Sequence, residues 1–419
     1  MLIFKWKTEK KKTEQSPKTS TFQTVVLFSC SKYLVCKNTY NSIISRKAIL
    51  IYKIMIYNII CKPRKGEMNN IEIFAQRLKN ARKMKGYSMD DLVAAMDNSL
   101  SKMSISKYES CKLTPNSSII ISLSKALDQP VDYFFKPFSI HIESIKFRKL
   151  KSKLGSKQEN SIKEKISDLI ERYIMIEEIC NASFAFSSPF KEKISKIDQI
   201  KIAAHELRKM WQIGNDGIVN VIELLEEHGI KVMEIDAPES FDGLSSLVND
   251  MYPVIVLNKD FPSERKRFTA LHELAHIILP FDSSVSNKEE ESLCNLFASE
   301  MLILEHVFKS IFGHNRQEIT YQELRSIQLQ YGISCDAMMY KAKETGIISE
   351  QRYKLFCIQK NKNHLFKQKI ETSLYPREES NRFVRLVYNA LSNELITISK
   401  AASLLHQSVD QVREDLVLV

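Results

Sequence analysis

The hexapeptide Leu271-His-Glu-Leu-Ala-His276 constrains this chain more than any other feature, and it lies in an apolar-patterned segment from Ser263 to Leu279. That pattern predicts a helix, on which positions four apart share one face. His272 and His276 can therefore direct imidazole nitrogens at one metal ion, with Glu273 beside it as a base. A zinc site is the prediction. A pair of core histidines satisfied by hydrogen bonds is the alternative.

A third protein ligand is expected downstream, because catalytic zinc takes three protein ligands and leaves one position open. One arrangement places a His or Asp six residues after the second His with a Gly between them, and those positions hold Leu279 and Asp282. The other takes a Glu from a following helix, and residues 289–302 have apolar helical spacing with acids at the start. Because the Gly is missing, Glu291 is the predicted ligand and Asp282 the alternative.

Two stretches carry a family resemblance: Arg-Phe-Thr-Ala-Leu-His-Glu-Leu-Ala-His at 267–276 and Glu-Ser-Leu-Cys-Asn-Leu-Phe-Ala at 291–298. Together they resemble the ImmA/IrrE family of metallo-endopeptidases. The resemblance implies a minimal zincin-like α+β domain, Zn²⁺ as the cofactor and a polypeptide substrate, since members often cleave a cognate repressor or antitoxin. The family's three ligand positions and its base fall, in this order, on His272, His276, Glu291 and Glu273.

Length and charge set the broad class of the protein. The 419 residues are 44% hydrophobic, which suits several domains with buried cores. The net charge of +11 resides in residues 1–67, which hold 14 Lys and Arg against 3 Asp and Glu, so it does not by itself indicate DNA binding. The eight Cys show no CxxC spacing, and no signal sequence precedes them. A reduced, cytoplasmic protein is expected.

Residues 1–67 have few acids and no helical or strand period. Their apolar stretch from Ala48 to Cys61 is short and interrupted by Lys53, so no membrane span is predicted. We expect this segment to be a mis-assigned or disordered extension, with Met68 as the true start. A genuine basic arm is the alternative.

Residues 68–137 are patterned as four short helices joined by polar turns, which predicts an all-α helix-turn-helix domain. The segments Ser88-Met-Asp-Asp-Leu-Val93, Met103-Ser-Ile-Ser-Lys-Tyr-Glu109 and Lys112-Leu-Thr-Pro115 resemble the phage-repressor, or XRE-type, DNA-binding domain. The resemblance implies that the exposed face of the third helix reads the major groove of a double-stranded operator. By position, that face holds Lys102, Met103, Ser106 and Lys107. A four-helix interaction module that does not bind DNA is the alternative.

The other regions follow from their periodicity. Residues 138–198 read as a connector with a strand at 139–147 and a helix at about 160–180, and 199–310 read as the peptidase domain. Residues 311–419 read as a helical region with a polar linker at 359–379 and two last helices, at 381–391 and 399–418. The predicted protein is therefore multidomain and mainly α, with a small sheet.

These features predict a DNA-binding transcriptional regulator with zinc-dependent endopeptidase activity toward a repressor or antitoxin. One alternative is a regulator whose zincin-like domain senses a ligand or partner without hydrolysis, and another is a scaffold that acts through binding alone. The sequence leaves open whether the chain forms a homodimer.

Overall fold

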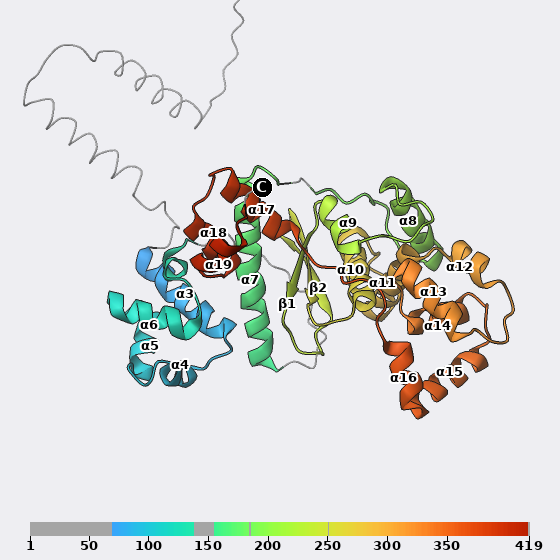
Figure 1. Cartoon of the computed structure of the whole chain (residues 1–419), viewed down its shortest axis with the longest axis horizontal. Helices are drawn as coiled ribbons and strands as arrows, with labels where there is room; N and C mark the ends of the chain where they lie inside the picture. The colour runs from blue at the N-terminus through green and yellow to red at the C-terminus, as the bar shows by residue number, and fades with distance from the viewer. Residues whose placement is uncertain (1–68, 138–154, 184–185, 250, 418–419) are drawn as a thin grey trace, which may run out of the picture. The chain divides into compact units, whose positions relative to one another are not determined.

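The computed structural model describes residues 69–137, 155–183, 186–249 and 251–417 (Figure 1). The fold described below is that of the unit that begins at residue 68. The expected extension at 1–67 and the strand expected at 139–147 lie outside the described residues. The described part is mainly α with one three-stranded sheet, which confirms the predicted fold class. None of its helices is both long enough and apolar enough to cross a membrane.

The N-terminal helical domain has the predicted order of elements. It comprises α3 (Asn70–Met84), α4 (Met89–Ala95), α5 (Lys102–Glu109), α6 (Ser117–Leu127) and the 3-10 helix η1 (Val131–Phe135). A polar side chain caps the start of each α-helix, supplied by Asn69, Ser88, Ser101 and Asn116. One fully buried residue from each element builds the core: Leu78, Leu92, Ile105, Leu123 and Phe134.

Helix α7 (Ser156–Ile179) joins this domain to the sheet. On one side, Arg77 of α3 makes a buried two-bonded ion pair with Glu171, at 2.7 and 2.8 Å. On the other side, Ile166, Ile170 and Tyr173 pack against the sheet. Separating Arg77 from Glu171 would leave a buried charge uncompensated, which is costly. The ion pair and the apolar contacts therefore both fix the position of α7.

The sheet has the order β1 (Lys231–Ile235), β3 (Tyr252–Asn258), β2 (Gly243–Val248). Strand β3 is parallel to β1 and antiparallel to β2, so β2 is an edge strand. Val254 and Val256 of β3 face α7, whereas Ile255 and Leu257 face the large helical core, as the two-residue period requires. Both faces of β3 are therefore buried.

Four helices surround the core on the second face of the sheet: α8 (Ile197–Met210), α9 (Val221–Glu227), α10 (Ser263–Ile278) and α11 (Asn287–Leu302). Strand β2 passes very close to α10 at Gly243, where an added Cβ would lie 2.7 Å from the Thr269 methyl group. Only glycine fits at this point, and the close approach places β2 beside the HExxH helix.

The C-terminal region differs from its sequence prediction in three places. Helix α12 (Glu305–Phe312) was not predicted, and the supposed linker contains the end of α15 (Glu350–Lys362) and all of α16 (His364–Glu371). The expected last helix is instead two, α18 (Ile398–Leu405) and α19 (Val409–Asp415), separated at His406 by a left-handed residue with φ 54°. The other helices are α13 (Tyr321–Tyr331), α14 (Cys335–Glu344) and α17 (Arg382–Ser392).

Residues 372–380 form a polar strap that the buried end of α10 holds. Glu264 accepts hydrogen bonds from the backbone of Leu374 and Tyr375 at 3.0 and 3.2 Å. Arg267 forms a buried ion pair with Glu378. Gly332, at φ 60°, lets the backbone pass against the Arg267 guanidinium, where a Cβ would lie 2.4 Å from Nε. The segment predicted to be a polar linker is therefore attached to the domain, because its backbone and Glu378 pair with buried side chains of α10.

Candidate active site and nucleic-acid interface

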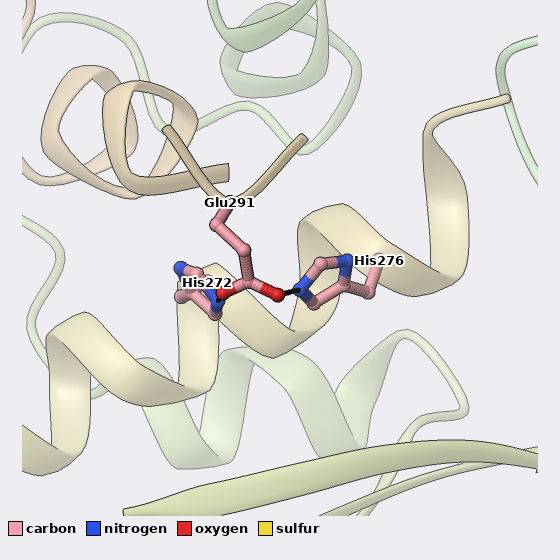
Figure 2. A group of neighbouring side chains, drawn as sticks. All are labelled: His272, His276 and Glu291. Atoms are coloured by element: carbon pink, nitrogen blue, oxygen red, sulfur yellow. Dashed lines mark ion pairs between the residues drawn. The ribbon is translucent and has the colours of Figure 1, made fainter. Parts of the chain in front are cut away.

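The HExxH histidines project from one side of α10. Its buried side, which includes Leu271, Leu274 and Ala275, packs in the core. His272 and His276 lie one turn apart on the other side, with ring centroids 4.9 Å apart. Figure 2 shows both rings directed toward the carboxylate of Glu291, which comes from α11.

The two imidazoles converge on Glu291 through the same ring atom. Nε2 of His272 lies 3.4 Å from Oε2 of Glu291, and Nε2 of His276 lies 3.7 Å from Oε1 (Figure 2). One donor atom from each of the three residues lies within 4.8 Å of the others, and no second group of this kind occurs among the described residues. Two neutral imidazoles and one carboxylate form a donor set that zinc takes in catalytic sites, so the residues fit that ion.

The other ring nitrogens are held by a surrounding layer of side chains. Nδ1 of His272 lies 2.9 Å from Oδ1 of Asn295, and Nδ1 of His276 lies 3.1 Å from Oε1 of Glu290. An oxygen acceptor at Nδ1 keeps the proton there and leaves the Nε2 lone pair for a metal ion. Sequence reasoning did not include Asn295 or Glu290 in the site. Their spacing on α11 does not single them out, because each contacts a histidine of α10 and not Glu291.

Glu273, the predicted base, is held from the sheet. Ser245 of edge strand β2 is buried, and its Oγ donates a hydrogen bond of 2.6 Å to Oε2 of Glu273. This contact ties the position of the carboxylate to the edge strand. Sequence patterns do not predict this contact, because the two residues are 28 positions apart and meet only through the packing of β2 on α10.

Two other residues near this segment, Asp282 and Cys294, lie outside the converging group. Asp282, the alternative ligand, is outside the converging group and pairs with Lys193 at 3.7 Å. A hydrogen bond from the Ser284 backbone is the main reason that the pKa of Asp282 lies below its usual range. Cys294 is fully buried, with Sγ 3.4 Å from Nδ1 of His276.

The four residues predicted to read DNA are all exposed on α5, while Ile105 is buried on its opposite side. Met103 is 66% exposed, and Lys102 pairs with Asp90 of α4 at 2.7 Å. The C-terminal end of α5 is fixed at Glu109, whose carboxylate accepts hydrogen bonds of 2.6 and 2.8 Å from the guanidinium of Arg82 on α3. The helix thus presents Lys102, Met103, Ser106 and Lys107 from a rigid support.

Comparison with known families agrees with both halves of this description. The profile of peptidase family M78, described as IrrE N-terminal-like domain, matches residues 225–343, and the profile described as helix-turn-helix matches residues 78–134. The chain joins a helix-turn-helix domain to an IrrE-like peptidase-family domain. No curated protein matches it. The first match covers the sheet, the HExxH helix and Glu291, and the second covers the last turns of α3 and all of α4 to α6.

Proposed function

We propose that this DNA-binding regulator is also a zinc-dependent endopeptidase that cleaves a cognate repressor or antitoxin. The observation that carries the proposal is the convergence of His272, His276 and Glu291, with Glu273 held beside them by Ser245. A purely structural histidine pair has no need of a neighbouring base fixed in this way. The family match supports a peptidase. The repressor or antitoxin substrate is proposed here in addition.

In this mechanism His272, His276 and Glu291 would hold Zn²⁺, which would supply Lewis-acid chemistry toward a water molecule and the scissile carbonyl. Glu273 accepts the proton of that water and passes it to the leaving amine. Ser245 keeps one oxygen of Glu273 occupied, which orients the carboxylate.

The edge of the sheet provides a place for an extended substrate. Strand β2 pairs with β3 along one side only, and its Ser245 contacts the base. A peptide that adds to the outer side of β2 would gain main-chain hydrogen bonds and lie next to Glu273. A flexible segment of a folded regulator, such as a linker between its domains, suits this geometry because it can become extended.

The ligand assignment predicts the metal content of variants. Glu291→Ala should lose most bound zinc after dialysis, because it removes a direct ligand, whereas Asp282→Ala should retain wild-type content. Glu290→Ala should lower zinc affinity by about 10–100-fold, since it releases Nδ1 of His276. Metal analysis of the purified full chain measures all three. If only the Asp282→Ala variant lost zinc, Asp282 and not Glu291 would be the third zinc ligand.

The DNA-reading face predicts a second set of results. Lys107→Ala should weaken binding to the preferred duplex by about 1–3 kcal/mol if Lys107 contacts a base edge, with a smaller effect on random duplex. Lys79→Ala, a lysine exposed on α3, is the control and should change neither. Selection of bound duplexes from a random pool, followed by titration of both duplexes, supplies the measurement. Equal loss on both duplexes would assign Lys107 to the phosphate backbone.

A further inference from the structure

A cavity lies between the helix-turn-helix domain and the first turns of α7, and charged side chains are among the residues that line it. Its volume is about 360 Å³, and its lining contains three cationic side chains, Arg82, Lys83 and Lys157, with no carboxylate. Tyr87, Ser156 and Asn160 also line it. Hydroxyl and amide groups of this kind donate hydrogen bonds to phosphate oxygens in protein–DNA complexes. The lining is therefore suited to an anion.

Two of the three cations are each fixed by a carboxylate that lies outside the lining. Arg82 is held by Glu109 and by the Tyr87 carbonyl, and Lys83 lies 3.1 Å from Glu164, which is buried. A buried carboxylate holds its partner because separating the pair leaves an uncompensated charge. Arg82 and Lys83 thus form an ordered wall of the cavity.

Lys157 differs because its carboxylate partner, Asp91, has a second hydrogen-bond donor. Its Nζ lies 3.2 Å from Asp91, and the two side chains are 65% and 47% exposed. Asp91 also accepts a 2.7 Å bond from the Ser88 backbone, within the capping box of α4. The pKa of Asp91 lies below its usual range, first because of these bonds from Ser88 and only then because of Lys157. An exposed pair of this kind contributes little, so Lys157 can turn to another anion.

The cavity lies next to the DNA-reading helix. Asp90 and Asp91 are consecutive residues of α4, and each pairs with a lysine from a different helix. Asp90 pairs with Lys102, the first residue of α5, and Asp91 pairs with Lys157 of α7. The ammonium group of Lys157 therefore lies at the same end of the domain as the start of α5.

We propose that this cavity binds a phosphate of the DNA backbone, and that Lys157 extends the DNA interface beyond the helix-turn-helix domain onto α7. The proposal rests on the DNA binding proposed above. The proposal links DNA binding to the sheet through one helix. Helix α7 packs on the sheet through Ile166 and Ile170, so the helix that contacts DNA also covers one face of the sheet.

The salt dependence of DNA affinity tests this proposal on the full chain. The probe is a random-sequence duplex titrated between roughly 50 and 200 mM salt, where one phosphate contact contributes a slope of about 0.9 in log K against log salt. Lys157→Gln should reduce the slope by about that amount and raise Kd about eightfold at roughly 0.1 M salt. Lys157→Arg should keep both values.

Lys354→Gln is the matched control. Lys354 is 69% exposed and pairs with Glu350 at 2.9 Å on α15, far along the chain from α7, so this variant should keep the wild-type slope. A wild-type slope in Lys157→Gln would overturn the proposal, as would calorimetric binding of inorganic phosphate that depends on Lys157 while DNA affinity does not. Wild-type protein that binds no duplex at all would instead refute the proposed DNA-binding function.

Discussion

Glu273→Gln should abolish hydrolysis while zinc and DNA binding remain at wild-type levels. Glutamine keeps the size of the side chain and can still accept the hydrogen bond from Ser245. It cannot take a proton from water, and loss of a general base costs about 10²–10⁴-fold in rate. The three proposed metal ligands are unchanged, and α5 lies more than a hundred residues earlier in the chain. The expected result is therefore a selective loss of one activity.

The measurement has two parts. Purified full chain is mixed with candidate repressors or antitoxins, and intact substrate is followed by mass spectrometry; target-gene expression is then followed in cells. Glu206→Gln, an exposed residue of α8, is the control and should behave as wild type. If Glu273→Gln derepresses the target genes as well as wild type does, hydrolysis is not the output. The reading as a non-proteolytic sensor would then replace the proposed endopeptidase.

The helices and strands were largely predictable because local patterns determine them. The side chains that cap α3, α4, α5 and α6 are Asn or Ser, and the strands show short apolar runs. The convergence of His272 and His276 follows from helical spacing alone. The position of Glu291 does not follow from local spacing, since its side chain reaches the histidines only because α10 and α11 pack together.

The contacts that orient the site were beyond sequence reasoning for a definite reason. Asn295, Glu290 and Ser245 are ordinary polar residues, and each acts through one partner that is distant in sequence. The same limit explains why α7 was expected to be a connector. Its apolar side matches a sheet whose other side is covered by the helical core, and periodicity alone does not say which element covers which face.

Hydropathy did not predict the buried role of Glu378, a polar residue in the otherwise largely exposed strap at 372–380. Glu378 is 3% exposed and pairs with Arg267, whose guanidinium is fully buried. Burial raises the pKa of Glu378, and the charge of Arg267 opposes that rise. A second oxygen of Glu378 accepts a 3.0 Å bond from the Val221 backbone at the start of α9. One side chain therefore joins three elements.

Glu378→Ala should destabilise the peptidase-family domain by about 3–5 kcal/mol, because it leaves the buried charge of Arg267 uncompensated. The Nε of Arg267 is already buried without a hydrogen-bond partner, so the guanidinium depends on its remaining contacts. Glu379→Ala is the control: Glu379 is 46% exposed, pairs only with exposed Arg377 and should cost less than about 1 kcal/mol. Urea titration of the full chain, followed by tryptophan fluorescence, measures both.

Zinc retention gives this prediction a second readout, because Arg267 lies on the same helix as the proposed zinc ligands His272 and His276. Glu378→Ala should release zinc at a lower urea concentration than Glu379→Ala does, with the release coinciding with unfolding of α10. Glu378→Gln, which keeps the shape and one acceptor oxygen, should fall between the alanine variant and wild type. Equal stability of Glu378→Ala and Glu379→Ala would mean that the strap is not part of the core. The HExxH helix would then be supported by its apolar contacts alone.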